Sequence, residues 1–257
     1  MNGPIAMLGP AAVQSFGLAL LFAAIFALGV HVRLPGILAR HQRKLLSFSA
    51  GISVAYVFVH LLPEVETARA VLVQSTADWS VPLPAYLVSL TTLAGFMLFY
   101  GVDRLVASSR PTGGGGGDEL KHDRLDYRLH IGIFAIYIGM VTYLRINTLE
   151  EGETPTLLFA VAMGTHFLTV DHTLRREYGA SYAGTGHFIL AGAAIAGWAL
   201  GVVTQLSKPL TIFPLALLSG AIIAISLIEE LPEENEGRFW SFLAGGVLYA
   251  AILVPLA

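Results

Sequence analysis

The best candidates for chemistry in this sequence are ionisable side chains placed inside long apolar segments. The stretch 155–174 carries His166, Asp171 and His172. Imidazole and carboxylate groups are ligands for divalent metals, and their cost inside a membrane marks them as candidate functional groups. On a helix, Asp171 lies about 140° around the axis from His166, so one straight helix cannot bind a single ion with both. A second helix, or local unwinding of this one, is needed to complete a site.

Both side chains also have a simpler structural interpretation. Asp171 precedes Arg175 by one helical turn, so the two can form an ion pair. A neutral His166 can form a hydrogen bond with a neighbouring helix. The sequence leaves both interpretations open.

Two further pairs of side chains have the one-turn spacing of a helix face. His60 and Glu64 can share a metal ion or pass a proton, although a histidine that caps a helix end is equally ordinary. Glu229 and Glu233 have the same spacing and can pass a cation onward. Because the chain has no cysteine, any metal must be bound by His, Asp, Glu or weaker oxygen ligands.

The elements that must hold these groups are transmembrane helices. Of 257 residues, 55% are hydrophobic and 13% charged, with a mean hydropathy of +0.68, which excludes an ordinary soluble domain. No room remains for a separate catalytic domain, so we do not expect an enzyme, and a net charge of -3 offers no basic surface for nucleic acid. We predict an all-α integral membrane protein with eight transmembrane helices, at about 11–31, 45–63, 83–102, 128–146, 155–174, 186–206, 210–230 and 239–256.

The basic residues predict how these helices cross the lipid bilayer. With the N-terminus outside, twelve Lys and Arg residues fall in inner loops, and only Arg69, Arg145 and Lys208 fall outside. The positive-inside rule therefore places both termini on the external side. The segment 104–126 becomes an inner, cytoplasmic loop, which we expect to be flexible because it contains the run Gly113–Gly117.

Two of the expected helices end in related motifs, separated by a constant offset of 169 residues. Gly, Ala, Leu, Pro and Glu align between the segments 51–64 and 220–233. The predicted topology makes the two helices antiparallel, as in transporters built from inverted repeats. Proline is expected to end each helix near this motif.

These motifs resemble the ZIP family of divalent-metal transporters. The resemblance rests on Ala50–Glu64, Ala94–Arg104 and Ser219–Glu233. Eight spans, two external termini and a polar inner loop after the third span also match. The resemblance implies import of zinc, iron or related ions by a bundle that moves against a scaffold, with ligands on the fourth and fifth spans.

The chain departs from the family in those ligand motifs. Where the fourth span usually reads His-Asn-x-x-Asp/Glu-Gly, this chain has Phe134, Ala135 and Ile138 in place of ligands. Where the fifth usually reads His-Glu-x-Pro-His-Glu, only His166 and Asp171 remain. The usual two-metal centre cannot be built, although a single site using His166, Asp171 or His172 can.

Together these patterns predict a ZIP-like transporter or channel for a divalent cation of the zinc or iron class, in a bacterial inner membrane. A bound divalent metal, zinc, is the one cofactor candidate, and small residues on several spans suggest a homodimer. The alternatives are a non-metal carrier or sensor on the same scaffold and an intramembrane metal-dependent hydrolase. The predicted ion path has three stations. His60 and Glu64 lie at the outer entry, His166 and Asp171 lie near the midplane, and Glu229 and Glu233 lie at the exit.

Overall fold

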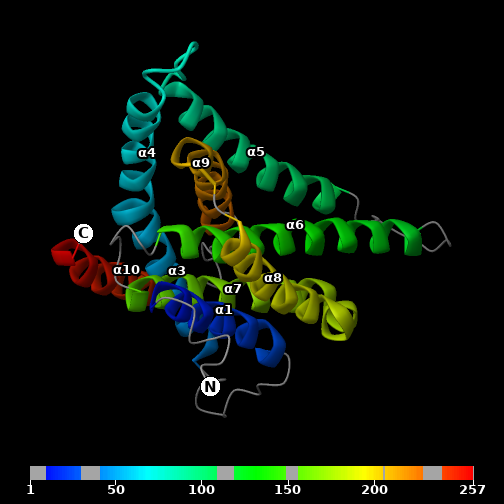
Figure 1. Ribbon diagram of the computed structural model, residues 1–257. Coiled ribbons are helices and arrows are strands. Elements are labelled where there is room, and N and C mark those ends of the chain that lie inside the picture. Colours follow the sequence, from blue (N-terminus) through cyan, green and yellow to red (C-terminus); the bar gives the residue numbers. More distant parts are fainter. Residues whose placement is uncertain are drawn as a thin grey trace, which may run out of the picture.

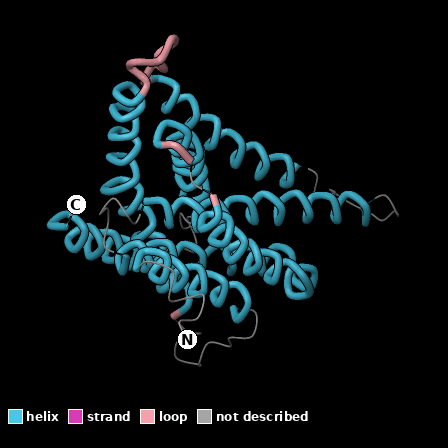
Figure 2. The backbone as a smooth tube through the Cα atoms, in the orientation of Figure 1, coloured by secondary structure: helices cyan, strands magenta, loops and turns pink. Residues whose placement is uncertain are grey.

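The computed structural model describes residues 10–29, 41–108, 119–148, 156–204, 206–227 and 239–256, and it is helical throughout these ranges apart from short connections (Figure 2). No strand occurs in this part of the chain, so the all-α prediction is confirmed. The helices are α1 (Pro10–Gly29), α3 (Gln42–Tyr56), η2 (Val57–Leu61), α4 (Leu62–Ser75), α5 (Tyr86–Ser108), α6 (Glu119–Thr148), α7 (Thr156–Ser181), η4 (Tyr182–Gly186), α8 (His187–Val203), α9 (Lys208–Ile225), α10 (Phe239–Leu253) and η6 (Val254–Leu256).

The lengths and composition of these helices are those of a membrane protein. Within the described residues, four helical segments are long and apolar enough to cross a membrane: Arg43–Ser75, Tyr86–Leu105, Leu125–Ile146 and Thr156–Val203. A crossing needs about 20 apolar residues. Shorter apolar helices occupy Val13–Gly29, Pro209–Ile225 and Phe239–Leu253.

The helix that was expected to end at Pro63 continues past it. α3 passes through the π-helical turn η2 into α4, which runs on to Ser75. In this turn the N–H of Leu62 donates to the carbonyl oxygen of Val57, one residue further back than in an α-helix. Pro63 then lies in the first turn of α4, where a missing N–H is tolerated. The Leu-Pro-Glu motif therefore marks an irregular turn inside a long helix.

The expected inner loop at 104–126 is helical at both ends. α5 extends to Ser108 and α6 already begins at Glu119. Both extensions contain Leu and Arg, which are good helix formers, so these helices continue beyond their apolar parts. The glycine run Gly113–Gly117 lies outside the described residues.

The helix α6 lies between two groups of helices (Figure 1). On one side α5 packs along α9, and α4 contacts both. On the other side α8 packs along α6 and α1, while α7 contacts α1 and α3. α10 packs along α3. The main apolar core connects α6 and α7 with their neighbours, and a smaller core lies between α4, α5 and α9.

Two helix crossings use glycine in the same way. Where α3 crosses α10, a Cβ added at Gly51 would collide with the carbonyl oxygen of Phe242. Where α9 crosses α5, a Cβ added at Gly220 would collide with the carbonyl oxygen of Thr92. The two glycines are 169 residues apart, and their two partners are 150 residues apart. Each pair of backbones can approach this closely only because no side chain separates them.

Candidate functional site

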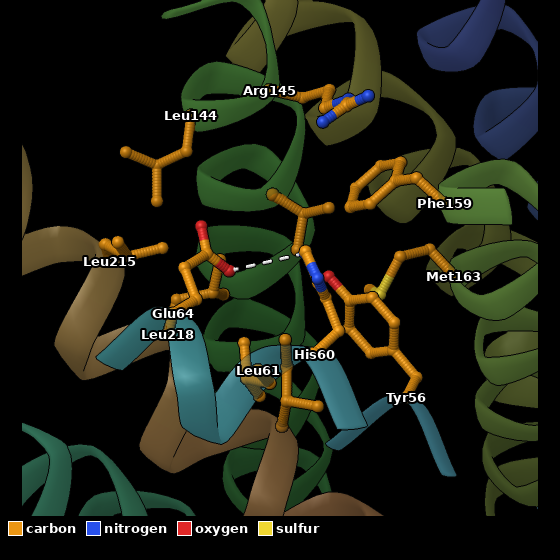
Figure 3. Close-up of a pocket in the computed structure, with 12 residues that line it drawn as sticks. Tyr56, His60, Leu61, Glu64, Leu144, Arg145, Phe159, Met163, Leu215 and Leu218 are labelled. Atoms are coloured by element: carbon orange, nitrogen blue, oxygen red, sulfur yellow. Dashed lines mark ion pairs between the residues drawn. The ribbon is translucent and has the colours of Figure 1, made fainter. Parts of the chain in front are cut away.

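A small pocket lies where η2 and the start of α4 meet α6, α7 and α9 (Figure 3). Its volume is about 40 Å³, and one buried water needs about 10–15 Å³. The polar side chains around it therefore share space for a few waters. The residues that line it are Tyr56, His60, Leu61, Glu64, Val141, Leu144, Arg145, Phe159, Met163, Leu215, Leu218 and Ile222.

His60 and Glu64 face each other across one turn, as their spacing predicts. His60 Nε2 lies 3.7 Å from Glu64 Oε2, and both side chains are largely buried. The ring of Tyr56 packs beside the imidazole, with ring centres 5.2 Å apart. His60 belongs to the π-helical turn, a backbone irregularity that is frequent at functional sites. This pair is the part of the predicted ion path that the fold brings together.

Arg145 is a pocket residue that the sequence analysis counted only as a charge on the outer side, near the end of the span expected at 128–146. It lies within α6, is 6% exposed, and holds its guanidinium 4.6 Å from the ring centre of Phe159 (Figure 3). An arginine stays protonated in proteins, so this pocket contains a permanent positive charge. The sequence does contain a signal for this position. Tyr137, Val141 and Arg145 are four residues apart, which puts them on one face of a helix.

His166 lies in the apolar core and is engaged by a neighbouring helix. Its Nε2 lies 2.8 Å from the hydroxyl oxygen of Tyr137, and it is 1% exposed. The simpler interpretation of His166, a hydrogen bond between helices, is confirmed. A metal ion at this nitrogen would have to displace the Tyr137 hydroxyl, a group that the sequence analysis did not assign to the site.

Asp171 is held in a separate cluster. Its carboxylate accepts hydrogen bonds from Arg175, as the alternative interpretation predicted, and from the Tyr182 hydroxyl at 2.6 Å. The carboxylate packs against α1, where a Cβ added at Gly29 would lie 2.5 Å from Asp171 Oδ2. This buried group therefore ties α7 to the turn η4 and to α1.

A further polar cluster lies on the N-terminal half of α6, where sequence analysis placed no site. His130 Nδ1 lies 2.6 Å from the hydroxyl oxygen of Tyr178 and 3.9 Å from the carboxylate of Glu177. His130 was expected at the start of its helix, but α6 begins earlier, at Glu119. The longer helix places this imidazole inside the bundle, where α7 supplies its partners.

The predicted ligands do not form one cluster. In the part of the chain that the structure describes, no group of three or more His, Cys, Asp or Glu residues is arranged to hold a metal ion. His172 is partly buried on α7, and Glu229 and Glu233 lie outside the described residues. Metal binding by this set remains a prediction.

No family model matches the chain, and no curated protein matches it in sequence. The resemblance to the ZIP family therefore depends on the motifs of this sequence alone.

Proposed function

We propose that this protein is a membrane carrier on a ZIP-like, eight-helix scaffold, and that it moves a small zwitterionic solute rather than a coordinated metal. The observation that carries the proposal is the buried guanidinium of Arg145 in the same pocket as His60 and Glu64. A divalent cation between His60 and Glu64 would be repelled by this permanent charge. A small zwitterion can place its anionic group at Arg145 and its cationic group at Glu64.

Eight crossings are supported by a bend in the longest apolar segment. Thr156–Val203 has 48 residues, and a straight helix of that length would measure roughly 72 Å, more than twice the thickness of a bilayer core. Gly179, near the C-terminal end of α7, has a φ of 46°, which kinks this segment shortly before η4. This segment supplies two of the eight crossings. The other six are α1, the continuous helix formed by α3 and α4, and the helices α5, α6, α9 and α10.

An inverted repeat is supported by matched features of its two expected halves. The glycine crossings of α3 with α10 and of α9 with α5 use residues at constant offsets. A π-helical turn begins at Val57 and another at Ser226, again 169 residues apart. Inverted halves are typical of secondary transporters, which alternate access to a site between them. We place both termini outside a bacterial inner membrane, as the basic residues predict.

Transport of a divalent metal of the zinc or iron class is the second candidate function. It is favoured by the His60–Glu64 pair, because an imidazole and a carboxylate 3.7 Å apart can share one ion. The metal carrier would require the positive charge of Arg145 to move away from the pocket when the ion enters.

Uptake into proteoliposomes separates the two candidates. We expect uptake of radiolabelled glycine or alanine, the smallest zwitterions of this kind, and loss of that uptake in Arg145→Gln and Glu64→Gln. Arg176→Gln, which removes an exposed charge from α7, is the matched control and should transport normally. Saturable zinc uptake that is lost in His60→Ala, without uptake of either amino acid, would establish the metal carrier instead. Uptake of none of these solutes above empty liposomes would refute both.

A further inference from the structure

His130, Glu177 and Tyr178 form a polar cluster between α6 and α7 that the proposed transport does not use. His130 Nδ1 lies 2.6 Å from the hydroxyl oxygen of Tyr178 and 3.9 Å from Glu177 Oε2. His130 is 3% exposed, and the side chain of Glu177 is 16% exposed. The cluster lies 15 residues before Arg145 on α6, about 22 Å along the helix, so it is separate from the solute pocket. Buried ionisable groups in a membrane-spanning segment are candidate functional groups.

A second carboxylate, on α5, shares a small cavity with His130. Asp103 and His130 both line this cavity, and its other walls are apolar side chains of α5, α6 and α9. Its volume is about 10 Å³, which is room for one water molecule with these two side chains as its polar partners. The imidazole of His130 therefore has one carboxylate on the side of α7 and another on the side of α5.

The other charged or titratable side chains around this cluster are exposed, have partners elsewhere or are acidic. Arg104, next to Asp103, is 63% exposed, and its guanidinium lies over the ring of Tyr100. On α8, His187 Nδ1 lies 3.0 Å from the carbonyl oxygen of Tyr182. The remaining ones on α6 and α7 are Asp126, one turn before His130, Tyr127, which donates to the carbonyl oxygen of Ser181, Arg175, which pairs with Asp171, and the exposed Arg128 and Arg176. The described parts of α1 and α9 bring no charged side chain to this end of α6. The charge that faces His130 is thus negative.

Protonation of His130 changes how strongly this cluster joins the helices. A neutral imidazole with a bare Nδ1 accepts one hydrogen bond, from the Tyr178 hydroxyl. An imidazolium donates from both nitrogens and attracts the carboxylates of Glu177 and Asp103, so it strengthens the contacts of α6 with α7 and α5 together. This stabilisation is fully present at acidic pH and is lost as the pH rises through the titration of His130.

We propose that His130, Glu177 and Asp103 form a proton-binding site, and that a proton bound there holds together this end of α5, α6 and α7. The predicted topology places this end on the inner side of the membrane. α6 also carries Arg145, so a separation of α6 from α7 at this end gives a bound solute an exit to the inside. Loss of the proton to an alkaline interior favours this release. The last step rests on the proposed carrier function, whereas the proton site does not.

The absence of cysteine allows a direct test with pairs of spin labels. Leu125→Cys on α6 and Ala180→Cys on α7 place exposed labels beside the cluster, and Ile136→Cys with Leu157→Cys is the matched pair further along the same two helices. Double electron–electron resonance in lipid nanodiscs measures both distances at about pH 5 and pH 8, the range in which histidine titrates. We expect the first pair to gain a population with a longer distance at the higher pH and the second pair to stay unchanged.

Two variants assign the response to this site. His130→Gln should show the longer distance at both pH values, because glutamine cannot take up the charge. Glu177→Gln keeps the imidazole and should give a smaller pH response than the wild type. His41→Gln, which removes an exposed histidine, is the matched control and should respond as the wild type does. A wild-type distance that does not change with pH would overturn the proposal, and so would a full response in His130→Gln or Glu177→Gln.

Uptake of radiolabelled glycine into proteoliposomes tests the link to transport. Raising the inner pH at constant outer pH should raise the initial rate severalfold in the wild type and leave the rate of His130→Gln unchanged. An equal rise in both would overturn the link between the proton site and release. A pH-dependent distance without any glycine uptake would support the proton site and contradict the glycine carrier, so the two proposals fail separately.

Discussion

The two glycine crossings predict that glycine-to-alanine substitutions have opposite signs at different positions of the same bundle. Gly51 and Gly220 each face the backbone of a crossing helix, so an added methyl group meets a carbonyl oxygen. Gly132 and Gly192 have no atom within 4 Å of an added Cβ and are therefore matched controls on α6 and α8. All four lie inside helices, so they gain equally from the better helix propensity of alanine.

The expected magnitude is set by the competition of two effects. Replacing glycine by alanine inside a helix is favourable by about 1 kcal/mol in intrinsic propensity. Overpacking costs about 1–3 kcal/mol, and here it cannot be relieved by a side-chain rotation, because the colliding atoms are main-chain atoms. The free energy of unfolding should therefore fall or stay level for Gly51→Ala and Gly220→Ala, and rise by up to about 1 kcal/mol for Gly132→Ala and Gly192→Ala.

Reversible unfolding in mixed micelles of dodecylmaltoside and sodium dodecyl sulfate, followed by far-UV circular dichroism, measures these differences. The matched geometry also requires Gly51→Ala and Gly220→Ala to lose similar amounts of stability. If both variants were as stable as the two controls, the close approach of the backbones, and with it the argument for matched halves, would be wrong.

The buried polar contacts give two further predictions. Tyr137→Phe and His166→Leu should show a coupling of about 0.6 kcal/mol in a double-mutant cycle, the average for hydrogen bonds between membrane helices, and of no more than about 1.7 kcal/mol. A coupling of zero would mean that the hydroxyl and the imidazole do not interact. Asp171→Asn should lower the free energy of unfolding by about 1.5–3 kcal/mol, because it weakens charged hydrogen bonds from Arg175 and Tyr182. Unfolding in the same mixed micelles measures both, and unchanged stability of Asp171→Asn would contradict the structural role given to this carboxylate.

The local features of the candidate site were predictable because they depend on short spacings. The contact between His60 and Glu64 and the pair of Asp171 with Arg175 both follow from residues one helical turn apart. The interpretation of His166 as a residue that bonds a neighbouring helix was also correct. Its partner, Tyr137, could not be named, because the rotation of α6 relative to α7 is a property of their packing.

Arg145 shows what a count of basic residues leaves out. Counting basic residues near span ends placed it on the outer side, at the end of the span expected at 128–146. In the structure its guanidinium lies over the ring of Phe159 and lines the pocket with His60 and Glu64, a contact that depends on the packing of α6 against its neighbours. Pro63 was likewise expected to end its helix. In the structure the helix continues past it, because Pro63 lies in the first turn of α4, directly after the π-helical turn.

Hydrophobic composition and segment length alone determined that this chain is helical and belongs in a membrane, because burying backbone polar groups in hydrocarbon requires internal hydrogen bonds. Spacing along each helix determined which neighbouring side chains share a face. Only the tertiary structure decided that His60, Glu64 and Arg145 meet in one pocket while His166 and Asp171 are held apart. Contacts between helices depend on their crossing angles and rotations, and these follow from packing of distant residues, such as Gly51 against Phe242, rather than from any local pattern.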